Sequence, residues 1–191
     1  YKFIKRALDL FFSLLLIIIL LPLMILISLI IKIDSPGSII FKQKRIGRDK
    51  KIFIMLKFRT MRTDTPSNVP THLFNNPQNY ITRVGKFLRK TSLDELPQLL
   101  NILLGEMSFV GPRPALYNQN DLINEREKNN SNKIRPGLTG LAQINGRDEL
   151  DIKTKAKYDG EYAKNISLFL DIKIIFLTVI KVFTHDGFRD F

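Results

Sequence analysis

Two adjacent carboxylates, Asp94 and Glu95, are the residues whose chemistry and setting are most informative in this chain. Their basic neighbours favour the ionised form of both side chains, and these neighbours are Arg83, Lys86, Arg89, Lys90 and Arg113. An ionised aspartate can attack phosphorus to give an aspartyl phosphate, and Mg²⁺ prefers carboxylate and phosphate oxygens as ligands. Arginine binds phosphate through its planar guanidinium group. The pair is therefore a candidate centre for phosphate chemistry.

The same pair also has a purely structural explanation. Thr91 or Ser92 would cap a helix, and Asp94 and Glu95 would lie in its first turn because carboxylates suit the positive end of the helix dipole. For an Asp-Glu pair taken alone we favour this explanation, since capping patterns are common. The apolar segment near the start of the chain, however, favours a catalytic role for the pair beside a membrane over the structural explanation.

From Leu10 to Ile31 the chain carries no charge. A straight helix of this length extends roughly 33 Å, enough to cross a bilayer core of about 30 Å. Pro22 lies in its middle, where it removes a backbone hydrogen bond and bends the helix. Both flanks are basic, and basic flanks stay on the cytoplasmic side of a membrane. We therefore predict a re-entrant membrane hairpin over residues 1–32, broken at Pro22.

A signal peptide and a buried core helix both fit the apolar segment less well. The run is long for the apolar region of a signal peptide, and no small-residue cleavage pattern follows it. Residues 33–191 are enough for one soluble domain with its own core. We predict an α/β fold, mostly helical with short strands, in which the hairpin precedes one compact cytosolic catalytic domain with interfacial amphipathic helices.

Composition narrows the chemistry further. The chain has no cysteine, which excludes disulfides, thiolate metal sites and cysteine nucleophiles. With only two histidines, a histidine-rich zinc site is disfavoured. The glycine-rich nucleotide-binding motifs are absent, as is the Asp-x-Asp metal motif of many nucleotide-sugar glycosyltransferases.

The net charge of +12 requires an acidic partner. Nucleic acid, anionic lipid headgroups and phosphorylated small substrates are the three candidates. The aromatic residues lie mostly in apolar stretches, unlike those of a nucleic-acid module, so we predict no nucleic-acid partner. The basic segment 41–48 follows the membrane segment and is better explained by contacts with membrane lipid headgroups.

Short elements before the carboxylate pair could present further basic groups. Strands are expected at 39–41 and 52–58, around a basic turn at 45–51. The segment from Lys57 to Arg62 alternates basic and apolar side chains. It is either an edge strand with a solvated basic face or a strand that turns Lys57 and Arg59 toward a phosphate site. Residues 63–80 form a loop, either over an active site or plain surface.

Elements after the pair are expected to hold Arg113. A helix over 80–90 leads to the Asp-Glu turn, and a second helix with Pro97 in its first turn ends at Gly105. A strand over 107–110 then enters Gly111-Pro112-Arg113-Pro114. The two prolines restrict this loop and would hold Arg113 in place, although an exposed loop arginine is the alternative.

The remaining elements carry weaker signals. Residues 117–133 are expected to form a polar surface helix and loop, 135–140 a turn, and 141–144 a short strand whose tight turn projects Arg147. Arg147 would contact phosphate or nucleotide, or would simply be solvated. An amphipathic helix is expected at about 166–184, buried or in the membrane interface. Its Asp171 would pair with a lysine or turn toward Asp94 and Glu95.

Together these segments resemble the bacterial sugar transferase family, the monotopic phosphoglycosyl transferases. The segments that carry the resemblance are Lys57-Phe58-Arg59-Thr60-Met61, Thr91 to Gln98, Met107 to Pro114, Arg135 to Thr139, Gln143 to Arg147 and Asp171. The resemblance covers about Lys2 to Phe183 and is strongest to small members that are little more than the catalytic domain, such as the PglC-type enzymes of protein glycosylation. The family breaks its re-entrant helix at a Ser-Pro pair, whereas Leu21 precedes Pro22 here. The break is expected to persist without the serine hydroxyl's hydrogen bond to the freed backbone.

The resemblance implies a membrane enzyme on the cytoplasmic face of the bacterial inner membrane. It would transfer a sugar 1-phosphate from a UDP-sugar to undecaprenyl phosphate and release UMP, the first membrane step of glycoconjugate synthesis, with downstream glycosyltransferases as further partners. An N-acetylated sugar such as diacetylbacillosamine is the expected donor sugar. A membrane-anchored binding protein for anionic lipid and a basic nucleic-acid module are the competing functions.

The resemblance also assigns roles to residues. Asp94 matches the family nucleophile, and Glu95 matches its partner in positioning or proton transfer. Mg²⁺, held at Asp94, would neutralise the donor diphosphate. Basic positions expected to hold phosphate or uridine groups are matched by Arg89, Arg113 and Arg147. Lys57 and Asp171 match further polar positions of the family.

Overall fold

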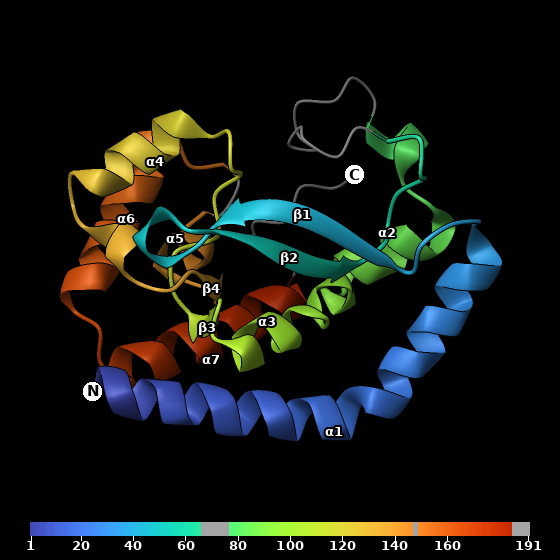
Figure 1. The fold of residues 1–191 in the computed structure, drawn as a ribbon, viewed down its shortest axis with the longest axis horizontal. Coiled ribbons are helices and arrows are strands. Elements are labelled where there is room, and N and C mark those ends of the chain that lie inside the picture. Colours follow the sequence, from blue (N-terminus) through green and yellow to red (C-terminus); the bar gives the residue numbers. More distant parts are fainter. Residues whose placement is uncertain (66–76, 147–148, 185–191) are drawn as a thin grey trace.

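A single long helix, α1 (Lys2–Asp34), borders the chain in the computed structural model, which describes residues 1–65, 77–146 and 149–184. Figure 1 shows α1 running along one side of the molecule and then bending. Pro22 lies inside the helix, and a proline there bends the axis because its nitrogen cannot donate a hydrogen bond. The predicted bend is present, but α1 is one continuous helix and not two helices folded back on each other.

The surface of α1 is largely exposed. Its most apolar window has a mean hydropathy of 3.4, and only 11% of that window is buried. By length and composition this helix could cross a membrane. Because so little of it is buried, α1 does not resemble the core helix of a soluble protein.

The rest of the molecule holds α1 near its start and near its end. In its first turns, Asp9 accepts hydrogen bonds from the Ser108 hydroxyl and the Phe109 amide, both 3.1 Å long. Near its end, Ile27 and Ile31 are buried in a cluster with Phe58. The two ends of α1 therefore contact the same compact body.

Strands β1 (Ile40–Ile46) and β2 (Ile52–Phe58) form an antiparallel pair in which Ile40 lies opposite Phe58. The prediction for β2 is confirmed, whereas β1 continues well past the predicted 39–41. Of the basic residues predicted in the turn, Arg45 belongs to β1, whereas Arg48 and Lys50 do lie in the turn. The turn itself is the short 3₁₀ helix η1 (Arg48–Lys50).

A second pair of strands, β3 (Ser108–Val110) and β4 (Gly137–Thr139), is parallel. We predicted 135–140 as a turn, and this prediction is wrong for β4. The two strands approach closely at Gly137, where a Cβ would overlap the backbone nitrogen of Gly111. The predicted strand at 141–144 is also wrong: it is the helical turn α5 (Leu141–Ile144), closed by hydrogen bonds to the Gly140 carbonyl.

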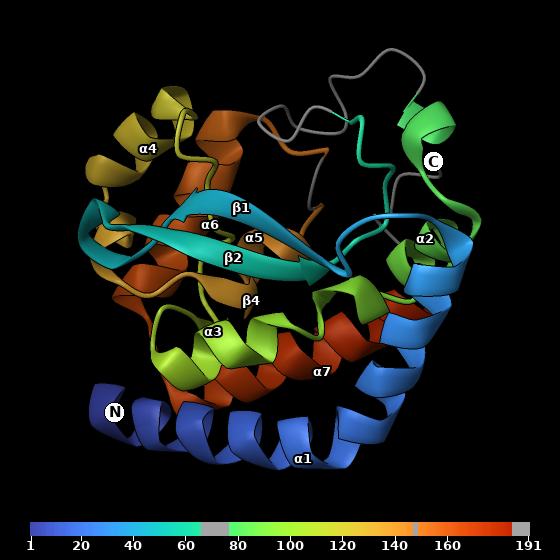
Figure 2. The same ribbon diagram turned by 45° about the vertical axis from the view of Figure 1, so that its right-hand side comes forward.

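Helices surround these strands (Figures 1 and 2). They are α2 (Arg83–Lys90), α3 (Gln98–Leu104), α4 (Asn120–Glu127), α6 (Ile152–Lys164) and α7 (Leu168–Thr184), with the 3₁₀ helices η3 (Pro77–Tyr80), η4 (Leu93–Glu95) and η5 (Ser131–Lys133). A mostly helical fold with short strands is thereby confirmed. Of the predicted loop 63–80, residues 66–76 lie outside the described part of the chain.

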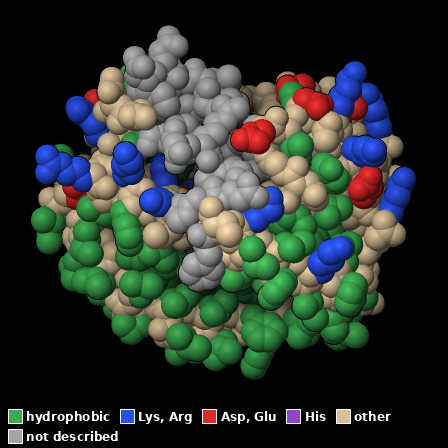
Figure 3. Space-filling model, turned by 180° about the vertical axis from the view of Figure 1, so that it is seen from behind, with side chains coloured by type: hydrophobic (Ala, Val, Ile, Leu, Met, Phe, Trp, Pro, Cys, Tyr) green, Lys and Arg blue, Asp and Glu red, His purple; other side chains and the backbone are tan. Residues whose placement is uncertain are grey.

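Helix α7 matches the helix predicted at about 166–184. Ile174 is fully buried, whereas Phe169 and Phe176 are 81% and 64% exposed. Seen from behind, the lower half of the molecule is covered by hydrophobic side chains and the charged side chains gather above them (Figure 3). The exposed apolar surfaces of α1 and α7 thus belong to one side of the molecule.

Candidate active site

Asp94, Glu95 and Lys57 meet where the end of β2 lies against η4. Lys57 Nζ lies 2.7 Å from Glu95 Oε1 and 3.6 Å from Asp94 Oδ2. All three side chains are largely buried, and Asp94 is 8% exposed. The lysine therefore lies between the two carboxylates, as expected if the basic face of β2 turned inward.

The position of Asp94 is set by a strained turn and not by a side chain that caps a helix. Ser92 has a φ of 57°, in the left-handed region that residues with a Cβ seldom adopt, and its side chain makes no cap. The Thr91 hydroxyl instead donates to the carbonyls of Phe87 and Leu88. The predicted hydroxyl cap is therefore not formed by Thr91 or Ser92, although Asp94 and Glu95 do lie in the first turn of η4. Strain of this kind is often found at functional sites.

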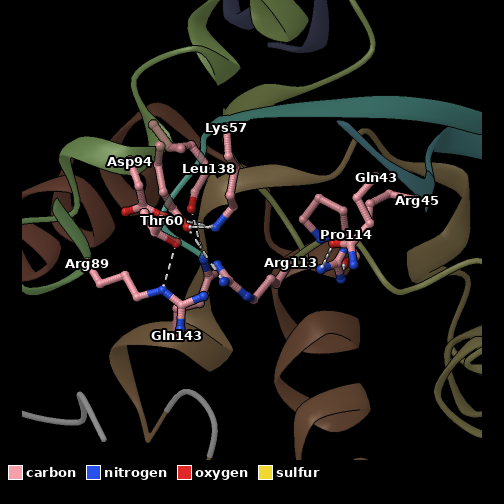
Figure 4. Close-up of polar contacts among 11 residues, drawn as sticks. Gln43, Arg45, Lys57, Thr60, Arg89, Asp94, Arg113, Pro114, Leu138 and Gln143 are labelled. Atoms are coloured by element: carbon pink, nitrogen blue, oxygen red, sulfur yellow. Dashed lines mark hydrogen bonds and ion pairs between the residues drawn. The ribbon is translucent and has the colours of Figure 1, made fainter. Parts of the chain in front are cut away.

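Arg89 reaches the site from the last turn of α2. Its Nε donates to the Thr60 hydroxyl at 2.9 Å, and its charge is close enough to Asp94 to attract it. Helix α2 packs tightly on this segment, since a Cβ on Gly85 would overlap the Thr60 carbonyl. Figure 4 shows Arg89, Asp94 and Lys57 gathered with Arg113 in one place. No sequence pattern singles out Thr60, whose role becomes visible only in this packing.

Arg113 approaches the pair from the opposite side. Its Nη2 lies 3.6 Å from Glu95 Oε1, and about a third of its side chain is exposed. Both flanking prolines, Pro112 and Pro114, are buried. The loop thus holds Arg113 at the rim of the site, as its two prolines led us to expect.

Two other arginines fasten this loop. Arg45 Nη1 donates to the Pro114 carbonyl at 2.9 Å, and the same guanidinium is fixed by the Gln43 amide oxygen at 2.6 and 3.0 Å (Figure 4). Arg126 Nη2 donates to the Arg113 carbonyl, also at 2.9 Å. The backbone of Arg113 and Pro114 is therefore held by one guanidinium from β1 and one from α4.

Arg126 is itself paired with Asp159 of α6. The guanidinium nitrogens Nη2 and Nε lie 2.7 and 2.8 Å from Asp159 Oδ2, and both side chains are buried. Burial raises the pKa of Asp159, while the charge of Arg126 opposes that rise. We predicted 117–133 as surface, and for Arg126 this prediction is wrong. No local pattern marks Arg126, because its partner is 33 residues away.

Burial also dominates the electrostatics of Asp94. It raises the pKa of this carboxyl above the ordinary value of 3.8, and repulsion from Glu95 adds to the rise. Attraction by Lys57, Arg89 and Arg113 opposes it without cancelling it. These basic neighbours favour ionisation of Asp94, as expected, but desolvation is the larger effect and favours the neutral form.

Some of the residues selected from the sequence lie elsewhere. Arg59 is buried and donates to the Ser35 and Pro36 carbonyls, so its guanidinium holds the turn after α1. Asp171 accepts hydrogen bonds from Lys5 and two tyrosines and does not contact Asp94. Arg147 lies outside the described residues.

Another side chain of this region, Gln143 of α5, has an unusual environment. Its Nε2 donates to the Leu138 carbonyl at 2.9 Å, while its Oε1 is buried without a hydrogen-bond partner in the described part of the chain. An unsatisfied buried acceptor costs free energy until a ligand or water binds it. Gln143 is therefore a candidate ligand contact to which we assigned no role from the sequence.

The donors available to a metal ion are few. In the ranges that the structure describes, no three acidic or histidine side chains converge. Asp94 and Glu95 supply oxygen ligands of the type that Mg²⁺ prefers, and Glu95 is engaged by Lys57. Mg²⁺ commonly binds one or two carboxylates together with substrate phosphates. The site therefore fits Mg²⁺ only when a phosphorylated substrate completes its ligands.

The comparison with known protein families gives one match. The model of the bacterial sugar transferase family matches residues 1–185, so the chain belongs to that family of transferases.

Its relatives include a UDP-glucose:undecaprenyl-phosphate glucose-1-phosphate transferase of Escherichia coli K12, which is 41% identical over 96% of this chain. The exopolysaccharide production protein PSS of Rhizobium leguminosarum is 43% identical over 95% of the chain. A UDP-galactose-lipid carrier transferase of Erwinia amylovora is 40% identical over 97% of it.

These relatives differ in length. The chain spans 41% and 42% of the two named transferases and 96% of the exopolysaccharide protein. The family match over residues 1–185 includes every site residue described above.

Proposed function

We propose that this protein transfers a sugar 1-phosphate from a UDP-sugar to undecaprenyl phosphate through a covalent intermediate on Asp94. The observation that carries the proposal is a buried aspartate on a strained turn, within reach of Lys57, Arg89 and Arg113. Buried carboxylates surrounded by cations are suited to accept and stabilise phosphoryl groups. The activities for which the relatives are named support a UDP-sugar donor and an undecaprenyl phosphate acceptor.

The reaction has two displacements at one phosphorus atom. In the first, an Asp94 carboxylate oxygen attacks the β-phosphorus, the bond from that phosphorus to the bridging oxygen breaks, and UMP leaves with the electron pair. In the second, a phosphate oxygen of undecaprenyl phosphate attacks the same phosphorus, and the bond to Asp94 breaks. The products are undecaprenyl-diphosphate sugar and the regenerated carboxylate.

The surrounding side chains bind charge in this scheme. Arg89 and Arg113 lie on opposite sides of the pair and would hold the donor phosphates. Lys57 neutralises Glu95 and so lowers the repulsion that Glu95 exerts on Asp94. Glu95 positions Lys57 and Arg113. Mg²⁺, bound at Asp94 with the substrate phosphates, would supply neutralisation of the diphosphate charge.

The apolar surfaces of α1 and α7 support a membrane location (Figure 3). Because both ends of α1 contact the same body, a helix that dips into the bilayer and returns fits these contacts better than one that crosses it. Lys5 pairs with Asp171 at one end, and Asp34 accepts from the Val84 amide at the other. We propose a re-entrant α1 with the site on the cytoplasmic face of the bacterial inner membrane.

Two classes of donor sugar are proposed for testing. The relatives' names favour UDP-glucose or UDP-galactose. The resemblance to small catalytic-domain enzymes favours an N-acetylated sugar such as diacetylbacillosamine and a role in protein glycosylation. In either case the lipid product would pass to downstream glycosyltransferases.

The experiment that tests the function measures UMP release by the detergent-solubilised protein with Mg²⁺ and a panel of UDP-sugars. A stoichiometric burst without lipid is expected for one donor, together with a phosphosugar adduct in the intact mass. Both should vanish in Asp94→Asn, whereas Asp49→Asn on the exposed turn serves as the matched control and should retain them. Release only with lipid present would contradict the covalent step, and no release with any donor would favour a lipid-binding protein.

A further inference from the structure

An apolar hollow lies between the second half of α1 and helix α2. Its volume is about 320 Å³, and its lining residues are Ile27, Ile30, Arg83, Val84, Phe87 and Leu88. Ile27 and Leu88 are buried and form its floor, whereas Ile30 and Phe87 are 39% and 59% exposed. The hollow therefore opens onto the apolar surface of the molecule.

One cation, Arg83, belongs to the lining of this hollow. Lys86 and Lys90 are exposed on the same short helix and add to its positive charge. An apolar hollow beside basic side chains complements an amphiphile that joins a hydrocarbon chain to an anionic head. A neutral lipid would form no ion pair with these basic side chains.

Helix α2 also connects the hollow to the active site. Leu88 lines the hollow, and the next residue, Arg89, donates to Thr60 and attracts Asp94. Consecutive helical side chains point about 100° apart, so the two sites occupy neighbouring faces of one helix. A chain in the hollow would thus place its anionic head beside the arginine that faces Asp94.

We propose that this hollow binds the first part of the prenyl chain of the polyprenyl phosphate acceptor, an inference that rests on the proposed function. The volume lies at the small end of the range for ligand sites. It holds a short part of the chain next to the phosphate, while the remainder stays among the bilayer lipids. In this proposal the hollow contacts the chain of the acceptor, and Arg89 receives its phosphate.

A fluorescence titration tests binding without activity. The chain has no tryptophan, so Phe87→Trp introduces a single reporter into the lining. Undecaprenyl phosphate in detergent micelles should shift its emission saturably, and a phosphatidate at the same micellar fraction should not. The control Leu29→Trp, on an exposed neighbouring position of α1, should respond to neither lipid. Equal responses of the lining reporter to both lipids would mean a general acyl-chain site and would overturn the proposal, as would the lack of any response.

An occlusion variant tests the consequence for turnover. Ile30→Trp fills the mouth of the hollow and should raise the KM for undecaprenyl phosphate about tenfold, because part of the chain loses its apolar contact. The lipid-independent UMP burst should match that of the unsubstituted protein. Leu29→Trp should change neither quantity. An unchanged KM in Ile30→Trp would overturn the proposal, whereas failure of the unsubstituted protein to release UMP would overturn the proposed function instead.

Discussion

Lys57 and Glu95 form a close ion pair in the active site, with 2.7 Å between Nζ and Oε1. The same nitrogen lies 3.6 Å from Asp94, beyond hydrogen-bond distance. The lysine thus neutralises Glu95, and Asp94 keeps a carboxylate that is not bonded to it. This arrangement suits a nucleophile, since a direct hydrogen bond to a cation would reduce its electron density.

Replacing Lys57 by Met should lower kcat about 10²-fold. Without the lysine, Glu95 keeps an unneutralised charge beside the buried Asp94, so the pKa of Asp94 rises further. The acid side of the pH–rate profile should therefore move to higher pH. The double variant Lys57→Met/Glu95→Gln removes that charge and should move the profile back. A profile that is the same in all three proteins would contradict the proposed coupling.

The raised pKa of Asp94 predicts opposite effects on activity and stability. The neutral form is favoured in the folded protein, so the contribution to stability is full below the ordinary pKa and is lost as pH rises through the folded value. In Asp94→Asn the side chain cannot ionise, so this fall in stability with rising pH does not occur. Its melting temperature should exceed that of the unsubstituted protein at pH 7, and the difference should disappear near pH 3.8. Thermal unfolding across this range measures both; a less stable variant at pH 7 would contradict the assignment.

Activity should respond to pH in the opposite direction. The nucleophile must be ionised, so the lipid-independent UMP burst should decline as pH falls through the raised pKa of Asp94. The midpoint should lie above 3.8. Rapid-quench measurement of burst rate against pH gives this midpoint directly, and a midpoint at or below the ordinary value would show that burial does not control Asp94.

The buried Arg126–Asp159 pair should affect the active site through Arg113. Arg126→Met alone should destabilise the fold by about 3–5 kcal/mol because it leaves Asp159 buried without its partner. Arg126→Met/Asp159→Leu should recover most of this stability, since apolar pairs often replace buried ion pairs without loss. The Arg113 carbonyl still lacks its donor, so kcat/KM for the UDP-sugar should remain about 10- to 100-fold low.

A background variant distinguishes positioning from general damage. In Arg113→Ala, adding Arg126→Met/Asp159→Leu should cause little further loss of kcat/KM. The reason is that the Arg113 side chain, which the Arg126–Asp159 pair positions, is already absent. Independent, multiplicative losses would show that the pair acts on the site by another route. Denaturant unfolding of each variant separates stability from catalysis.

Asp171 should act on the docking of α1. Its carboxylate accepts from Lys5, Tyr1 and Tyr162 at 2.6–2.7 Å. Asp171→Ala should destabilise the protein by about 1–3 kcal/mol and speed tryptic cleavage after Lys5, because the helix start loses its buried acceptor. Asp49→Asn, in an exposed ion pair, is the control and should change neither measurement. Unaltered cleavage would contradict the tethering role.

Membrane topology can be measured because the chain has no cysteine of its own. Single cysteines at Lys2 and Lys50 flank α1 on both sides. In intact cells neither should react with a membrane-impermeant maleimide, and after permeabilisation both should react, as a re-entrant helix returns its ends to the cytoplasmic side. Labelling of only one position would show that α1 crosses the bilayer.

Several features of this protein follow from the sequence alone because they depend on neighbouring residues. Strand β2, the helix end at Gly105, where φ is 85°, and the apolar segment with Pro22 are set by side-chain period, backbone freedom and composition. The carboxylate pair among basic residues also marked a cluster that the structure brings together. Local chemistry was sufficient for each of these.

The tertiary structure decided what depends on distant partners. Lys57 meets Glu95 from 38 positions away, and Arg126 meets Asp159 from 33. Segment 137–139 is a strand because it pairs with β3. The Arg59 guanidinium binds a carbonyl in the turn after α1 and does not point toward the site. The balance between burial and charge at Asp94 belongs here as well, since desolvation exists only once the chain has packed around the carboxylate.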